Sequence, residues 1–361
     1  MSSRTEHEGA RAERKGSRTE DEGARGGRGG PGAGRTLLTL GTIRTGLLLN
    51  SGAIPHNALP ETLRLVPGER VRTSERPIGY GVSAEVLTGV DCALTAASGA
   101  RTRGVGTVAT RATITGGRIV QGSSYARFAA SDVDYRRPWA HFLGRPGTVE
   151  TIGKISSKDL AQGVRTDQRL VAGINLAAIC DRIIDLVQQS PGLDRSPPFR
   201  AARTTLRWVM RSGGDNDADH LSFVIVNSEL RLVELTVTDQ LTDRILPDVL
   251  RLCEDLALHD WLLTTLLSII ERSHMDSGEL RHMIAKLRPA VDHLLHLWMP
   301  GARVDSRLML LWDSLDKYPG FTKQWETSVS RIRDQLSLST LNLLGDVTQG
   351  KAGVHEHGVT G

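Results

Sequence analysis

The sequence predicts an α+β protein in which a β-rich N-terminal half precedes a mainly helical C-terminal bundle. Residues 36–150 are rich in Gly, Thr and Ser and contain alternating apolar positions, a pattern typical of strands. From about residue 174 the apolar positions mostly follow the period of a helix instead. The longest such run extends from Thr242 to Arg272, and the other C-terminal segments are expected to pack around it.

The length and composition exclude several classes of protein. A chain of 361 residues suffices for two domains or one large one. No stretch of about 18 uncharged apolar residues occurs, so no membrane span is predicted. The three cysteines, Cys92, Cys180 and Cys253, are far apart and form no CxxC pair. This spacing predicts reduced thiols in a cytoplasmic protein and argues against a zinc ribbon.

The positive charge is concentrated at the N-terminus. Residues 1–35 contain eight basic and six acidic side chains, which accounts for half of the formal net charge of +4. The rest of the chain is therefore near neutral and shows no basic stripe, so nucleic acid is not expected as a partner.

Both ends of the chain are predicted to be disordered. Residues 1–35 repeat the motif SRTEHEGA as SRTEDEGA, continue as GRGGPGAG and contain no large apolar residue after Met1. Such a segment cannot bury enough apolar surface to offset the entropy lost on ordering. We interpret it as a passive tail, and an arm that binds an acidic partner is the alternative. Residues 345–361 are Gly-rich and polar, and they are also predicted to be disordered.

The β-rich domain is predicted to span residues 36–150. Its first segment, RTLLTLGTIRTGLLL, suggests a strand or hairpin. A second hairpin is predicted where the alternating segment Thr107–Ile114 is followed by two glycines at 116–117 and then by RIVQGSSYARF. A two-residue turn there places Ile114 opposite Ile119.

A glycine-rich segment, SGARTRGVGTV, precedes this hairpin. It resembles a phosphate-binding loop but lacks the GK[ST] ending, and it leads into a strand where such a loop opens a helix. We therefore interpret it as the entry to a strand. Four arginines near it could form a cationic patch, although a solvated face is the more common arrangement: Arg101, Arg103, Arg111 and Arg118.

Residues 151–172 are predicted to connect the two domains, and residues 173–344 to form the mainly helical one. The segment NLAAICDRIIDLVQQ predicts a helix capped by Asn175, and FRAARTTLRWVM predicts the next helix. One β-hairpin is expected near 220–238.

Four further amphipathic helices are predicted, over 242–272, 278–299, 305–317 and 322–344. Because the links between them are short, we expect them to form an antiparallel bundle.

Asp260 is the most unusual residue of the long helical run. A helical wheel places it on the apolar stripe, between Leu256 and Leu263. A buried carboxylate without a partner is costly, so we expect an ion pair or a raised pKa. Arg333, at the edge of the last predicted helix, is the preferred partner, and the Trp261 N–H or Thr264 could add a hydrogen bond.

Asp260, His259 and Asp255 are the candidate catalytic residues of a hydrolase-type site. His259 lies at the edge of the apolar stripe, and Asp255 lies one turn before it. No GxSxG motif occurs, and Cys253 lies on the apolar face, where a core role is the simpler interpretation.

A metal site would combine Asp255 and His259 with Asp292, His293 and His296, because carboxylates and imidazoles projecting into a bundle can bind metals. The wheel places His296 almost opposite the apolar stripe of its helix, which favours a solvated polar face. We therefore predict no metal and no cofactor.

The chain resembles a family of actinobacterial proteins to which no activity is assigned. The residues that carry the resemblance are LCEDLALHDWLLTTL, RPAVDHLLHLWMPGARVDS, PGFTKQW, SRIRDQL and, upstream, GVGTVATRATITGGRIVQ, and they span roughly residues 36–341. The resemblance implies a gene neighbourhood that contains a variant P-loop protein and a methyltransferase-like protein. It implies a partner protein encoded nearby, and it transfers no catalytic residue.

The sequence therefore predicts a non-catalytic interaction or scaffold component of a multi-protein bacterial system. The alternative is a hydrolase-type enzyme with a polar site around Asp255, His259 and Asp260.

Overall fold

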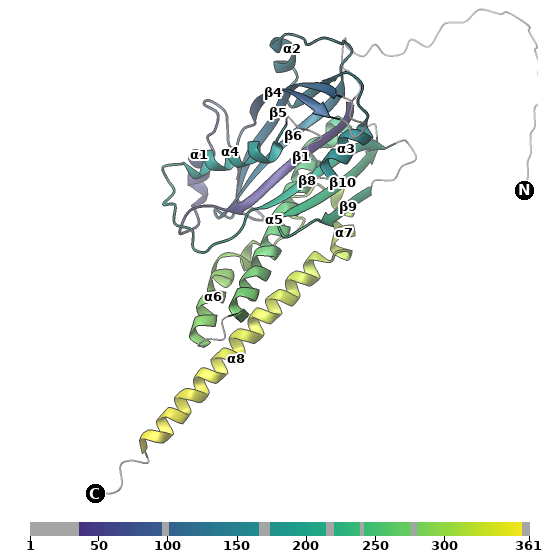
Figure 1. Cartoon of the computed structure of the whole chain (residues 1–361). Helices are drawn as coiled ribbons and strands as arrows, with labels where there is room; N and C mark the ends of the chain where they lie inside the picture. Colours follow the sequence, from purple (N-terminus) through teal and green to yellow (C-terminus); the bar gives the residue numbers. More distant parts are fainter. Residues whose placement is uncertain are drawn as a thin grey trace, which may run out of the picture. The chain divides into compact units, whose positions relative to one another are not determined.

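A computed structural model describes residues 36–95, 101–165, 174–213, 220–238, 242–275 and 280–355. These residues form an α+β fold built on one ten-stranded sheet (Figure 1). The predicted N-terminal tail, 1–35, lies outside the described residues. The strands are β1 (Thr36–Leu47), β2 (Arg72–Ser74), β3 (Tyr80–Val82), β4 (Val86–Thr95), β5 (Arg101–Thr115), β6 (Ile119–Ala130), β7 (Thr148–Ile152), β8 (Thr204–Gly213), β9 (His220–Ile225) and β10 (Leu230–Thr238).

The helices lie between and after these strands. They are α1 (Leu59–Thr62), α2 (Trp139–Leu143), α3 (Ser157–Arg165), α4 (Leu176–Gln188), α5 (Thr242–Met275), α6 (Leu280–His293), α7 (Met309–Lys317) and α8 (Phe321–His355). Short 3-10 turns are η1 (His56–Ala58), η3 (Leu295–Leu297) and η4 (Ser306–Leu308). The helix α8 therefore runs past the predicted helix end at residue 344, and residues 356–361 lie outside the described part.

The strand order is β2-β3-β5-β7-β6-β1-β8-β10-β9, and β4 pairs with β5 beside this path. Most neighbours are antiparallel, whereas β6 with β7 and β8 with β10 are parallel. The sheet joins strands that precede and follow the predicted connection at 151–172, since β1 pairs with both β6 and β8.

The strand β5 changes partners along its length. On one edge, β7 pairs with its first half and β6 with its second half. Gly106 lies at this exchange, where a Cβ atom would be 2.0 Å from the Thr148 carbonyl oxygen. Only a glycine allows the two backbones to approach so closely.

The glycine turn predicted between β5 and β6 is confirmed, but its register is wrong by one residue. Gly116 and Gly117 have φ of +59° and +63°, as a type I′ turn requires. Arg118 is an additional residue in the loop, so Thr115 and not Ile114 pairs with Ile119. Because side chains alternate along a strand, this shift places Ile114 and Ile119 in different apolar clusters.

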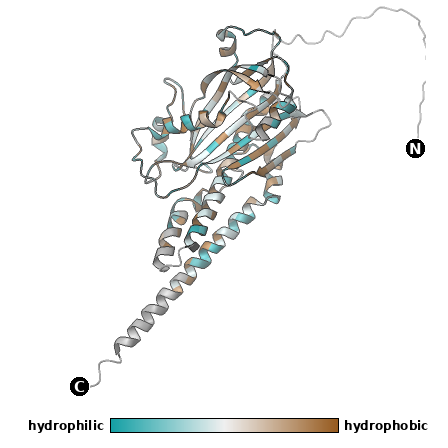
Figure 2. Cartoon of the chain, in the orientation of Figure 1, coloured by the Kyte–Doolittle hydropathy of each residue, from teal (hydrophilic) through white to brown (hydrophobic). Residues whose placement is uncertain are grey.

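The two faces of the sheet are covered by different helices. Ile43 of β1 and Trp208 of β8 lie in the cluster that packs against α5. Leu38 and Leu40 of β1 lie in a second cluster, on the side of α3 and α4. Figure 2 shows many apolar residues in the strands and both residue types mixed along the first part of α8.

Of the two helices predicted between residues 174 and 210, the first is confirmed and the second is wrong. The helix predicted at NLAAICDRIIDLVQQ is confirmed as α4, and the Asn175 side chain accepts a hydrogen bond from the Ala178 N–H at 3.0 Å. The helix predicted at FRAARTTLRWVM is wrong, because Thr204–Gly213 forms β8 in the sheet. The side chains Leu206, Trp208 and Met210 alternate there, and all three are buried against α5.

The hairpin predicted near 220–238 is confirmed as β9 and β10. The antiparallel C-terminal bundle is not confirmed, because α5 packs against the sheet as well as against α6 and α8. Every residue from Leu252 to Leu263 of α5 is buried. The single apolar stripe therefore underestimates how much of this helix lies in the core.

The three cysteines are free, and Cys180 and Cys253 are buried. Within the described ranges, no helix combines the length and hydropathy needed to cross a bilayer.

Candidate anion-binding pocket

Asp260 is buried and paired, but not with the predicted partner. Its Oδ1 atom accepts a hydrogen bond from Arg231 Nε of β10 at 2.8 Å, and both side chains are about 95% buried. The Arg231 guanidinium also donates to Thr264 Oγ1 and to the Asn227 carbonyl oxygen. Burial raises the pKa of Asp260, and the attraction of Arg231 offsets only part of this rise. These bonds hold α5 against β10.

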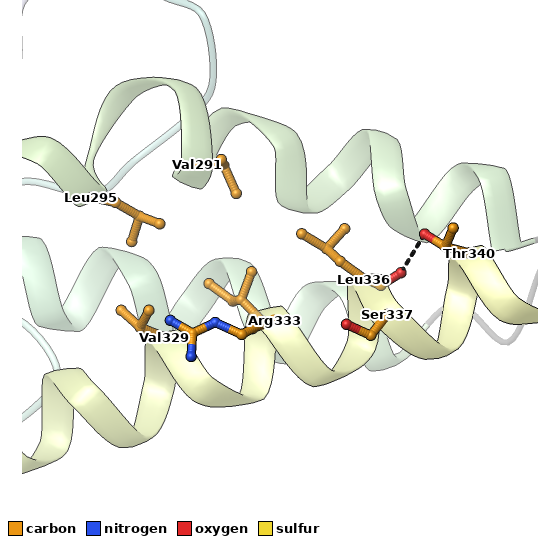
Figure 3. Close-up of a pocket in the computed structure, with 8 residues that line it drawn as sticks. Val291, Leu295, Val329, Arg333, Leu336, Ser337 and Thr340 are labelled. Carbon is orange, nitrogen blue, oxygen red and sulfur yellow. Dashed lines mark hydrogen bonds between the residues drawn. The ribbon is translucent and has the colours of Figure 1, made fainter.

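The prediction that Arg333 pairs with Asp260 is wrong. Arg333 is exposed on α8 and lines a groove between this helix and the end of α6, together with Val291, Leu295 and Leu336 (Figure 3). The helical wheel could not identify Arg231, because this arginine reaches Asp260 from a strand.

Asp255 and His259 support the turn that follows η3. The Gly301 N–H donates to Asp255 Oδ2 at 2.8 Å. His259 Nδ1 lies 2.7 Å from the Asp255 carbonyl oxygen, and the Met299 N–H donates to His259 Nε2 at 3.3 Å. This arrangement corresponds to a neutral imidazole that carries its proton on Nδ1. Burial lowers the pKa of His259 despite the nearby Asp255 carboxylate, in agreement with a neutral ring.

The candidate metal ligands are not brought together. His259 is buried against Trp298 and Trp312, whereas Asp292 is exposed on α6 and pairs with Arg288. His293 stacks on Phe199, and His296 is exposed. Among the described residues, no group of three or more His, Cys, Asp or Glu side chains is arranged to hold a metal ion.

A pocket of about 380 Å³ lies between the sheet and the first turns of α5. Its walls carry five arginines, two glutamates and two tyrosines, with apolar residues from β3 and α5. The lining residues are Arg72, Tyr80, Val82, Glu85, Arg111, Tyr125, Arg127, Leu246, Pro247, Leu250, Arg251, Glu254 and Arg303.

Glu254 lies at the inner end of this pocket and is fully buried. Arg111 Nε of β5 and Ser123 Oγ of β6 donate to its Oε1 atom at 2.8 Å and 2.7 Å. Arg303 Nη2 donates to Oε2 at 3.2 Å. Burial alone would raise the pKa of Glu254, but Arg111 and Arg303 together lower it below its ordinary value. The carboxylate is therefore ionised at neutral pH.

Arg303 is the second buried cation beside Glu254. Its side chain is only 3% exposed, its guanidinium lies 4.7 Å from the centre of the Tyr80 ring, and its longest hydrogen bond reaches Thr115 Oγ1 at 3.3 Å. Its Nε–H is buried and has no hydrogen-bond partner in the described part of the chain. Two buried guanidinium groups thus share one buried carboxylate, and the exposed Glu85 is a second negative charge near Arg111.

Tyr125 and Arg251 of the lining also have charged partners. Tyr125 donates to Glu85 at 3.1 Å, and burial together with this carboxylate raises the pKa of Tyr125 to about 12. Arg251 pairs with Asp248 at 3.2 Å. At neutral pH the lining thus offers hydrogen-bond donors and positive charge.

The sequence analysis identified one residue of this pocket. Arg111 belongs to the predicted cationic patch. Arg103 lies in the first half of β5 and pairs with Asp91 of β4, and Arg118 lies in the β5–β6 loop, so neither lines the pocket. The side chain of Arg101 lies outside the described part. Glu254 was missed, although it is a charged residue within the mainly apolar run Thr242–Arg272, which is visible in the sequence.

No protein-family model matches this sequence, and comparisons with curated proteins and with solved structures give no significant match. The resemblance to an actinobacterial family therefore stays a prediction, and the functional argument below rests on the geometry of the pocket.

Proposed function

We propose that this protein is a non-catalytic, ligand-binding component of a multi-protein bacterial system, and that its pocket binds an anion. The observation that carries the proposal is the sharing of one buried carboxylate, Glu254, by two buried guanidinium groups, those of Arg111 and Arg303.

The surplus charge gives a physical reason for anion binding. A buried charge without a counter-charge costs several kcal/mol, and a buried donor without an acceptor adds to that cost. An anion in the pocket beside the Arg303 guanidinium would neutralise this second cation. Arginine is well suited to this role because its planar donors match the oxygens of carboxylates and phosphates.

A binding role is supported better than the hydrolase-type alternative. The residues proposed for hydrolysis have structural partners. Asp255 accepts a hydrogen bond from the Gly301 N–H, His259 accepts one from the Met299 N–H, and Asp260 accepts one from Arg231. In the pocket itself, Glu254 is a weak base because its pKa is lowered, and Tyr125 is a weak acid because its pKa is raised.

We further propose a protein partner and a cytoplasmic location. The free thiols support the reducing compartment. The exposed side chains of Leu338 and Leu341 on α8, 62% and 64% accessible, support a contact with another protein.

Arg303→Met should weaken anion binding by roughly tenfold to a hundredfold, because a charge-assisted hydrogen bond contributes about 1.5–3 kcal/mol. The variant removes the surplus cation and leaves Glu254 paired with Arg111. The measurement is isothermal titration of the full chain with inorganic phosphate, pyrophosphate and citrate in turn.

Arg103→Met is the matched control, since Arg103 is an exposed arginine outside the pocket. It should bind these anions like the wild type. Equal binding by Arg303→Met and the wild type, or no binding of any anion by the wild type, would contradict the proposal.

A further inference from the structure

The pocket has a polar part and an apolar part. Arg111 and Arg303 meet Glu254 at the inner end. Towards the start of α5, the wall consists of Leu246, Pro247 and Leu250, with Val82 of β3 contributing from the sheet. A simple inorganic anion would contact only the first part.

The size of the pocket also exceeds what an inorganic anion needs. Its lining runs along α5 from Leu246 to Glu254, a distance of about 12 Å at 1.5 Å per residue. A volume of about 380 Å³ falls in the range of about 300–1,000 Å³ typical of small-molecule sites. The ligand therefore has a body as well as a charged group.

The charge of the lining favours a phosphate over a single carboxylate. Arg72 and Arg127 line the pocket in addition to the inner pair, so arginines outnumber glutamates. A phosphate monoester carries about −1.5 to −2 at neutral pH and presents three acceptor oxygens, whereas a carboxylate carries one charge and two oxygens. One phosphate in the pocket could thus contact the guanidinium groups of both Arg303 and Arg111.

We infer that the ligand is an organic phosphate, whose phosphate group lies beside Arg303 and Arg111 and whose uncharged body lies against Leu246, Pro247 and Leu250. This inference rests on the proposed anion binding and adds the chemical class of the ligand. The half-buried ring of Tyr125 offers the body an aromatic contact as well.

Isothermal titration of the full chain with ADP, ribose 5-phosphate, pyrophosphate and citrate tests the inference. ADP and ribose 5-phosphate carry a phosphate on an organic body, pyrophosphate lacks the body, and citrate lacks the phosphate. We expect at least one of the two organic phosphates, ADP or ribose 5-phosphate, to have an affinity at least about tenfold higher than pyrophosphate or citrate. Only an organic phosphate contacts both the polar and the apolar part of the pocket.

Pro247 provides a variant that addresses the body of the ligand alone. Its exposed side chain lines the apolar part, and replacing a proline within a helix removes no backbone hydrogen bond. Pro247→Trp should fill this part, lower the affinity for the organic phosphate by about tenfold and leave pyrophosphate binding within about twofold. Leu310→Trp, on the exposed side of α7 and outside the lining, is the matched control and should bind both probes like the wild type.

The outcomes separate this inference from the proposed function. If citrate binds as tightly as the organic phosphates, or if pyrophosphate does, the pocket binds anions but the inferred ligand class is wrong. The same conclusion holds if Pro247→Trp weakens neither organic phosphate. If no probe binds the wild type, both the inference and the proposed function are overturned.

Discussion

Glu254→Ala should destabilise the protein by about 3–5 kcal/mol, the largest effect we expect from a single substitution. The substitution leaves Arg111 and Arg303 buried without their shared counter-charge and leaves the Ser123 hydroxyl without its acceptor. The free energy of unfolding in urea measures this loss.

Two comparisons show whether charge is the cause. Glu254→Ala combined with Arg303→Met should recover part of the loss, because one cation is then removed. Added inorganic phosphate should stabilise Glu254→Ala more than the wild type, since the anion would replace the missing carboxylate. A loss that neither change reduces would indicate a packing defect and contradict the electrostatic account.

Asp260→Ala should cost a similar amount, about 3–5 kcal/mol, because Arg231 then stays buried without its carboxylate. The pair joins α5 to β10, so its loss affects the contact between the long helix and the sheet. Urea unfolding of the single variants Asp260→Ala and Arg231→Leu and of their combination gives the coupling energy.

The double variant should recover part of the stability, because neither charge remains alone. Asp260→Ala combined with Arg333→Leu is the matched control and should recover none, since Arg333 is exposed on α8. Rescue by Arg333→Leu, or a neutral Asp260→Ala variant, would contradict the buried Asp260–Arg231 pair.

Local features of the fold could be predicted because neighbouring residues determine them. The Asn175 cap of α4, the positive φ angles at Gly116 and Gly117, and the β9–β10 hairpin all depend on short segments. The one-residue error in the β5–β6 register arose because Arg118 adds a residue to the loop, and a two-residue turn motif does not specify that addition.

Features that depend on distant contacts could not be predicted in the same way. The segment Thr204–Gly213 is a strand because β1 and β10 pair with both of its edges, although its composition also suits a helix. The wheel identified Asp260 as an inward-facing carboxylate but could not identify Arg231, which lies 29 residues earlier on a strand.

The pocket illustrates the same limit. Glu254 is 143 residues from Arg111 and 49 residues from Arg303 in the sequence. A helical wheel of α5 describes only the residues of that helix. The excess of positive charge arises in the folded protein, where Arg111 of β5 and Arg303 of the turn after η3 both contact Glu254. Sequence reasoning thus assigned Arg111 to a surface patch and did not select Glu254.

Anomalous diffraction from crystals of the full chain soaked in tungstate, a heavy analogue of phosphate, tests the central claim most directly. The two guanidinium groups that share Glu254 predict an anomalous peak in the pocket, with tungstate oxygens within hydrogen-bond distance of Arg303 and Arg111. Crystals of Arg303→Met soaked in the same way should lack this peak. A wild-type pocket without tungstate, or an equal peak in Arg303→Met, would contradict the assignment of this pocket as an anion-binding site.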